Sequence, residues 1–169
     1  LRIVYESDPC HLTAERPLFF AMTAGSTGDY KYIPLTPSFK NAINRSVFAF
    51  YHFFESQCPE LSRHPIQFLV GSAEGGTAPV GIPQGFVSGF NYRNLPAFIR
   101  RKFIIPYWVF TLENADDRYY AMARFLAANG RVAAIGAFSP MNIANIVNAV
   151  QARLPVFIND LERGTLTIA

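Results

Sequence analysis

The chain is organised around the stretch Thr23-Ala24-Gly25-Ser26-Thr27-Gly28-Asp29-Tyr30-Lys31. Its first six positions hold two glycines and three hydroxyl side chains, and a lysine follows three residues further on. It follows an apolar run at residues 18–22, and we predict a buried strand over residues 18–23. A glycine-rich turn that leaves a strand can direct several backbone N–H groups into one anion-binding concavity. Hydroxyl groups add donors, and a lysine adds a point charge suited to phosphate. We therefore predict a loop that holds the phosphates of a nucleotide.

The loop matches neither of two well-known phosphate-binding signatures. The Walker-type loop has four residues between its glycines and ends in Gly-Lys-Ser or Gly-Lys-Thr, and this stretch has neither feature. The pattern G-x-G-x-x-G also fails, since Gly25 and Gly28 are three apart and no third glycine is in register. On composition alone, an ordinary strand-to-helix turn explains the stretch as well as a phosphate loop does, and both interpretations stay open.

The residues around the loop favour the phosphate interpretation. Residues 20–36, which read Phe-Ala-Met-Thr-Ala-Gly-Ser-Thr-Gly-Asp-Tyr-Lys-Tyr-Ile-Pro-Leu-Thr, closely resemble the phosphate-loop signature of the GH3 family of acyl-acid amido synthetases, a branch of the adenylate-forming superfamily. Ala24 stands where that family usually has serine, which removes a hydroxyl donor, and Ser26 stands where it usually has threonine. The resemblance covers nearly the whole chain and continues at Gly81-Ile82-Pro83-Gln84-Gly85, Ser88-Gly89, Asn94-Leu95-Pro96, Ile105-Pro106-Tyr107, Arg118-Tyr119-Tyr120 and residues 159–166.

The resemblance implies an ATP-dependent ligase that adenylates a small carboxylic acid and transfers the acyl group to an amine, usually that of an amino acid. It implies ATP accompanied by Mg²⁺, with no metal site of the protein's own, and it leaves the catalytic residues unassigned. A non-catalytic binding module that kept the fold and lost the chemistry is the alternative, which alanine at position 24 permits. The nucleotide-binding residues that the resemblance implies are Thr23, Ala24, Gly25, Ser26, Thr27, Gly28 and Lys31.

The resemblance also implies that residues 1–169 are a single partial domain, the N-terminal portion of a longer adenylating enzyme. The chain opens on Leu1 without a methionine and stops at Ala169 without a polar tail, which agrees with that expectation. The family's later nucleotide-binding motifs and its C-terminal lid domain are not in these residues, so we expect the chain alone to be inactive. The expected partners are the acid, the amine and the remainder of the same polypeptide.

Composition restricts the other possibilities. Half of the 169 residues are hydrophobic and only 16% are charged, which excludes a disordered chain and suggests surface that something else normally covers. The net charge of +3 is scattered, and the one basic run, Arg100-Arg101-Lys102, is too short to predict a nucleic-acid patch. Cys10 and Cys58 lack metal-ligand spacing and are expected to be free thiols. No stretch is long enough to cross a bilayer, so a cytoplasmic location is the default expectation.

Hydrophobic periodicity predicts an α/β fold in which strands alternate with packed helices. Residues 1–16 read as an arm with little regular structure, and residues 71–89, rich in glycine and proline, as a long loop or short hairpins. Strands are predicted at residues 66–70 and 131–138, and an extended or edge segment at residues 104–112. Helices are predicted at residues 36–55 with Thr36 as N-cap, 94–103 with Asn94 as N-cap, 114–129 with Asn114 as N-cap, 139–152, and 154–161 leading to Gly164.

Overall fold

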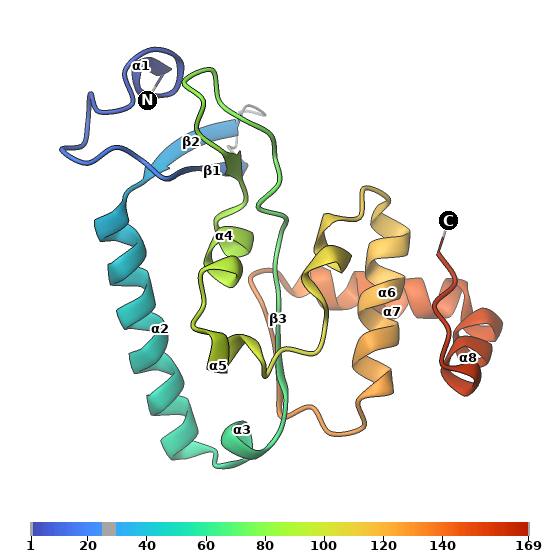
Figure 1. The fold of residues 1–169 in the computed structure, drawn as a ribbon. Coiled ribbons are helices and arrows are strands. Elements are labelled where there is room, and N and C mark those ends of the chain that lie inside the picture. Colours follow the sequence, from blue (N-terminus) through green and yellow to red (C-terminus); the bar gives the residue numbers. More distant parts are fainter. Residues whose placement is uncertain (1, 25–29, 169) are drawn as a thin grey trace. The chain divides into compact units, whose positions relative to one another are not determined.

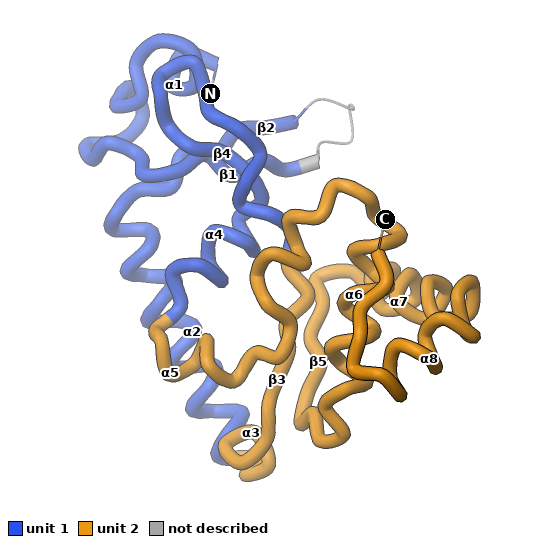
Figure 2. Tube along the Cα trace, turned by 45° about the vertical axis from the view of Figure 1, so that its right-hand side comes forward, with its two compact units in different colours: residues 1–56, 71–95 blue, residues 57–70, 96–169 orange. Residues whose placement is uncertain are grey.

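A computed structural model describes residues 2–24 and 30–168 and confirms the α/β fold (Figure 1). The chain divides into two compact units, residues 1–56 with 71–95 and residues 57–70 with 96–169 (Figure 2). Each unit has its own small sheet with helices packed around it. The expectation that residues 1–169 form part of one larger domain stays a prediction.

The first unit is built on a three-stranded sheet in the order β2-β1-β4. Strand β1 (Phe19–Ala24) pairs antiparallel with β2 (Tyr30–Leu35) and parallel with the short β4 (Gln84–Gly85). The N–H of Phe20 donates to the carbonyl of Pro83, on the side of β4. Phe20 is paired with Pro34 on the other side, and the two form a non-hydrogen-bonded pair of the ladder. Strand β2 is the edge of this sheet, which is where a strand tolerates proline.

Three helices belong to this unit: α1 (Arg2–Glu6), α2 (Pro37–Gln57) and α4 (Val87–Arg93). Helix α2 confirms the long helix predicted at residues 36–55, and the Thr36 hydroxyl accepts from the N–H of Phe39 at 3.2 Å as the expected N-cap. Helix α1 corrects the expectation of an irregular arm. Five residues are too few for helical periodicity to be visible in a sequence, and α1 is held instead by packing of Val4 and Tyr5.

The second unit is built around the parallel pair β3 (Ile66–Leu69) and β5 (Ala134–Ala137), and both strands lie within predicted segments. Helix α6 (Ala115–Ala128) packs against α7 (Pro140–Ala152) and α8 (Leu154–Arg163), and all three were predicted. Their shared core consists of Tyr120, Ala123 and Phe157 with partly buried side chains from α7, α8 and the chain beyond α8. Gly164 ends α8 in the left-handed conformation at φ 70°, where glycine is favoured.

The remaining elements of the second unit are α3 (Glu60–Arg63), α5 (Ala97–Arg100) and the 3₁₀ helix η1 (Tyr107–Thr111). Asn94 was predicted to begin a helix, but it ends α4: its side-chain amide donates to the carbonyl of Phe90 at 2.8 Å, and Pro96 precedes α5. The prediction of an extended segment at residues 104–112 is wrong from Tyr107 onward, because the 3₁₀ helix η1 begins directly after Pro106.

Candidate functional site

The glycine-rich stretch lies between two antiparallel strands, so a strand and not a helix follows it, and the choice between an ordinary turn and a phosphate loop stays a prediction. Among the predicted nucleotide-binding residues, Gly25, Ser26, Thr27 and Gly28 lie outside the described residues. Thr23 and Ala24 end β1, and Lys31 is the second residue of β2. Thr23 pairs directly with Lys31, and Ala24 with Tyr30. The structure therefore brings Thr23 and Lys31 together at the stem of the predicted phosphate loop.

Thr23 and Lys31 face the same side of the sheet, because directly paired residues of an antiparallel ladder share a face. Side chains alternate along a strand, so Phe19 lies on that face too, and its ring stacks on Phe90 of α4 with centroids 4.7 Å apart. Thr23 is half-buried and Lys31 is exposed. A hydroxyl donor and an accessible ammonium on one face beside the loop form a pair of groups suited to an anion such as phosphate.

The opposite face of the same sheet is covered by α1. The Tyr5 ring stacks on Tyr32 of β2 at 4.0 Å and meets Phe20 of β1 edge-on at 5.4 Å. Val4 of α1 and Phe20 of β1 are fully buried in one core cluster with Ala78 and Ile82. Burial, together with the neighbouring Tyr32 hydroxyl, raises the pKa of Tyr5. Both faces thus carry buried aromatic rings, and the threonine–lysine pair lies on the face of Phe19, opposite α1.

The segment predicted as a long loop or short hairpins is held to the outer edge of β4 by backbone hydrogen bonds. The N–H of Gly75 donates to the carbonyl of Gln84 at 2.8 Å, and the N–H of Gln84 donates to the carbonyl of Gly76 at 3.0 Å. Thr77 and Pro83 form an antiparallel bridge, and the pairing closes with the N–H of Ala78 on the carbonyl of Ile82. The sequence expectation of short hairpins is met here, and the segment is not a loose excursion.

Two of the glycines in this segment are required by close packing. A Cβ at Gly85 would lie 2.3 Å from the carbonyl oxygen of Ala73, and one at Gly89 would lie 2.3 Å from that of Gly71. Backbone atoms cannot move aside as a flexible side chain can. The Ser88 hydroxyl accepts from the N–H of Gly71 at 2.9 Å. Ser88 and Gly89, two residues that carry the family resemblance, therefore have a structural role.

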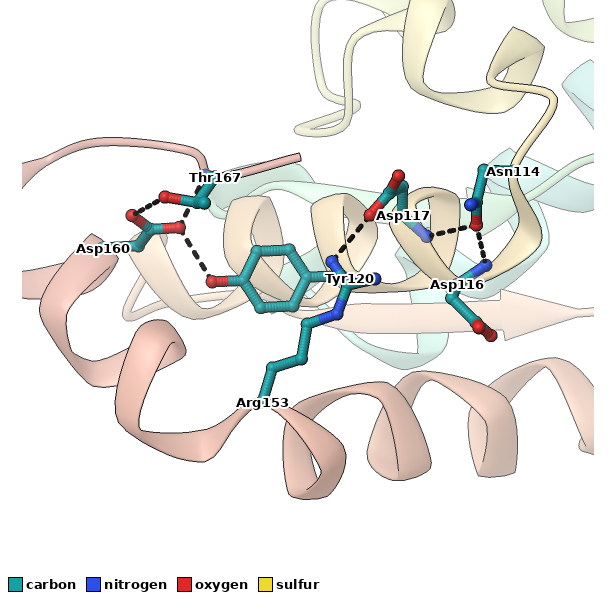
Figure 3. Close-up of polar contacts among 7 residues, drawn as sticks. All are labelled: Asn114, Asp116, Asp117, Tyr120, Arg153, Asp160 and Thr167. Carbon is teal, nitrogen blue, oxygen red and sulfur yellow. Dashed lines mark hydrogen bonds and ion pairs between the residues drawn. The ribbon is translucent and has the colours of Figure 1, made fainter. Parts of the chain in front are cut away.

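An acidic side chain with many hydrogen-bond donors around it is that of Asp160 on α8, in the second unit (Figure 3). Its carboxylate accepts from the hydroxyls of Tyr120, Thr165 and Thr167 at 2.7, 2.6 and 2.9 Å and from the N–H of Thr167 at 2.7 Å. The Thr165 hydroxyl and the other donors hold the pKa of Asp160 well below its ordinary value of 3.8. With four donors on two oxygens, this carboxylate is a structural anchor for the C-terminal segment.

Tyr120 and its neighbours complete this anchor (Figure 3). Burial first, and then the bond to Asp160, raise the pKa of Tyr120 to about 12. The Arg153 guanidinium lies over the Tyr120 ring, 5.2 Å from its centroid, and donates to the buried carboxylate of Asp117 at 2.6 Å. At the start of α6 the Asn114 side chain accepts from the N–H groups of Asp116 and Asp117. From the sequence, Asn114 was predicted as the N-cap with Asp116 and Asp117 in the first turn, and Tyr120 and Asp160 were noted only for their likeness to the family.

Within residues 2–24 and 30–168, no group of three or more His, Cys, Asp or Glu residues is arranged to hold a metal ion. Over the same residues, none of the helices combines the length and apolar character that crossing a bilayer requires. Cys10 and Cys58 are free and exposed.

Comparison with known proteins identifies the family. The family model described as the GH3 family N-terminal domain matches residues 4–168, which is nearly the entire chain. A search of curated proteins found no match. The match confirms the resemblance that the glycine-rich stretch indicated.

Proposed function

Because the chain belongs to the GH3 family, we propose that it is the N-terminal part of an ATP-dependent ligase that joins a small carboxylic acid to an amine. In the first step a carboxylate oxygen attacks the α-phosphorus of ATP, and pyrophosphate leaves. In the second step the amine, in the proposal that of an amino acid, attacks the acyl carbonyl of the adenylate, and AMP leaves. Such chemistry depends mainly on positioning and on stabilising the charge of the phosphate oxygens.

The observation that carries this proposal is the family match together with the position of Thr23 and Lys31. In the proposal the backbone amides of residues 24–28 and the hydroxyls of Thr23, Ser26 and Thr27 bind the β- and γ-phosphates. Lys31 supplies a cation on the face that it shares with Thr23. The antiparallel ladder fixes both residues at the stem, so neither has to be recruited when the nucleotide binds.

In the proposal, Mg²⁺ accompanies the nucleotide. Mg²⁺ is commonly bound through substrate phosphates and only one or two carboxylates, so the lack of an acidic cluster among the described residues is compatible with it. When bound, the ion neutralises charge that develops on the phosphate oxygens. The residues that would face the metal-bound phosphates are those of the loop and Lys31.

The remainder of the same polypeptide is the proposed partner of α2. This helix buries none of its 21 residues, and five of its phenylalanines are 39–59% exposed. A helix that is apolar over most of its circumference normally lies inside a larger protein. The exposed phenylalanines of α2 are Phe39, Phe48, Phe50, Phe53 and Phe54.

The test is ATP–pyrophosphate exchange by the complete natural protein with a panel of small aromatic and aliphatic carboxylic acids. Acid-dependent exchange is the expected result, and the acid that supports it identifies the substrate class. The variant Lys31→Ala should weaken ATP binding by about 10- to 100-fold, because a charged hydrogen bond to phosphate contributes on the order of 1.5–3 kcal/mol. No exchange with any acid, from protein shown to be folded, would exclude the ligase.

Alanine at position 24 favours a second candidate, a non-catalytic binding module with the same fold. The two candidates differ in three variants of the complete protein. A ligase predicts that Ala24→Ser preserves or raises turnover, and that Lys31→Ala and Gly28→Leu weaken ATP binding. A binding module that has lost the chemistry is indifferent to all three substitutions.

The 169-residue chain by itself is expected to be inactive. The proposed reaction needs further nucleotide-binding elements and a lid that carries a second catalytic lysine, which the resemblance places outside these residues. Pyrophosphate exchange by the isolated chain at a rate comparable to that of the complete protein would contradict this expectation.

A further inference from the structure

Gln84 is the residue through which three separate segments of the first unit are joined. Its backbone N–H and carbonyl pair with Gly76 and Gly75, and as part of β4 it pairs with Phe20 of β1. Its side chain makes two more bonds: the amide Nε2 donates to the carbonyl of Gly75 at 3.1 Å, and Oε1 accepts from the Tyr5 hydroxyl at 2.6 Å. One side chain therefore links α1, the glycine-rich segment and the sheet.

The carbonyl of Gly75, which can only accept, determines which way the Gln84 amide points, and the Tyr5 hydroxyl then holds the amide oxygen. A phenol donates to an amide oxygen and an amide nitrogen donates to a carbonyl, so the two bonds are compatible with only one orientation of the amide. Tyr5 is itself fixed between Tyr32 and Phe20. Without the hydroxyl, Oε1 loses this donor, and the bond from Nε2 to the Gly75 carbonyl alone has to hold the amide in place.

The segment that Gln84 holds lies against the last part of β1. A Cβ at Gly75 would lie 2.7 Å from the sulfur of Met22 and 2.9 Å from the Cα of Gly85. The Met22 side chain therefore occupies the space that the missing side chain of Gly75 leaves, one residue before Thr23. A shift of Gly75 changes the surface on which Met22 packs. The next residue along β1 is Thr23, at the stem of the proposed phosphate loop.

We propose that Tyr5 and Gln84 are positioning residues for nucleotide binding, which hold the glycine-rich segment against Met22 and so fix the end of β1 at Thr23. The inference rests on the proposed function, because it concerns the nucleotide site of that ligase. Neither residue lies on the stem itself, and the effect passes from Tyr5 to Gln84, to Gly75, to Met22 and so to Thr23. All of these residues belong to the first unit.

The test compares Tyr5→Phe with wild type in the complete protein, and Gln84→Met provides an isosteric second variant. Tyr5→Phe keeps both ring contacts and removes only the hydroxyl. We expect the KM for ATP to rise about fivefold, the usual effect of one neutral hydrogen bond, while the KM for the acid stays unchanged. Tyr119→Phe is the matched control, since it removes a tyrosine hydroxyl bonded to Asn142 at 3.2 Å in the other unit, and its KM for ATP should equal that of wild type.

A second measurement does not depend on turnover. Amide hydrogen exchange followed in peptides that span residues 20–24 and 73–77 should be about fivefold faster in Tyr5→Phe than in wild type or Tyr119→Phe. Unchanged exchange, or equal rises in the KM for ATP and for the acid, would overturn the positioning role while leaving the ligase proposal intact. An inactive but folded wild-type protein would instead remove the ligase proposal, and the positioning role with it.

Discussion

Helices α2 and α6 have the same kind of sequence and opposite surroundings. Both were predicted from apolar periodicity and an N-cap, and both caps are present, Thr36 before α2 and Asn114 before α6. No residue of α2 is buried, whereas six residues of α6 are. Periodicity therefore predicts the helix and its apolar side, and it does not predict whether another part of the same chain covers that side.

The difference originates in the elements that come after each helix along the chain. Helix α6 is succeeded by α7 and α8, which pack against it, and its buried Ala121 and Ala123 permit close approach. Helix α2 carries large aromatic rings instead, and these rings contact each other. The ring centroids of Phe50 and Phe54 lie 4.3 Å apart, and the Phe53 ring meets the Phe54 ring edge-on with centroids 5.6 Å apart. Substitutions should therefore have large effects around α6 and small effects on α2.

The largest effect is expected for Arg153→Met. This change removes the Arg153 guanidinium from its ion pair with the Asp117 carboxylate of α6, which is 3% exposed. We expect the free energy of unfolding to fall by about 3 kcal/mol, as for other broken buried ion pairs. The control is Arg2→Met, which removes the exposed Arg2–Glu6 pair and should cost at most about 0.5 kcal/mol in urea denaturation.

Equal effects of the two arginine substitutions would show that Asp117 is solvated, and the contrast between the helices would then be weaker than the structure indicates.

Tyr120→Phe should have the next largest effect, a loss of about 2 kcal/mol, because the Tyr120 hydroxyl donates to an ionised carboxylate. The effect depends on pH. Folding raises the pKa of Tyr120 from 10.0 to about 12. The contribution of Tyr120 to the free energy of unfolding is therefore complete below pH 10 and is lost as the pH rises toward 12. Thermal unfolding between pH 9 and pH 12 should converge for wild type and Tyr120→Phe. Parallel curves over that range would contradict the assignment.

At the acidic end the sign is opposite. The pKa of Asp160 is depressed by folding, so its contribution is complete above its ordinary pKa of 3.8 and is lost as the pH falls below that value. Wild type should therefore lose stability in acid more steeply than Asp160→Asn, in which no carboxylate titrates at this position.

The two N-caps allow a matched comparison at about 1 kcal/mol. Asn114→Ala should lower the free energy of global unfolding by about that amount, since α6 is part of a core. Thr36→Ala removes a cap of similar chemistry from α2, where the first turn can fray without opening a core. Hydrogen exchange should accelerate only near residues 37–41 in Thr36→Ala. A global loss equal to that of Asn114→Ala would mean that α2 unfolds together with the rest of its unit.

The sequence predicted best the elements whose start and stop are encoded locally. Ser139-Pro140 begins α7, and Gly164 ends α8, as the residue types require. The errors fall where a distant contact decides the local structure. Residues 2–6 form a helix because Tyr5 reaches Gln84, 79 positions away, and no local pattern shows that contact. Asn94 was assigned to the wrong helix because asparagine can end one helix as readily as it begins the next.

The candidate site was predictable as a stretch of sequence but not as a geometry. The composition of residues 23–31 and their likeness to one family identified the loop, and the family match agrees. The pairing of Thr23 with Lys31 depends on β2, a strand that contains Pro34 and gave no strand signal. Gln84 was noted only for its likeness to the family, since the importance of a glutamine side chain depends on partners that lie far away in the sequence.

The smallest effect is expected on α2, and it distinguishes a helix in solvent from one that is covered. Phe53 is 59% exposed, and Phe53→Gln in the 169-residue chain should change the free energy of unfolding by no more than about 0.5 kcal/mol. The control is Met122→Gln on α6, which places an amide where the side chain is 3% exposed and should cost about 2 kcal/mol. Phe53→Gln is then compared in the complete natural protein and in the 169-residue chain. If the substitution costs about 2 kcal/mol in the complete protein but not in the 169-residue chain, a part of the polypeptide outside these residues covers α2. Equal small costs in both proteins would leave α2 in solvent and contradict the proposed contact.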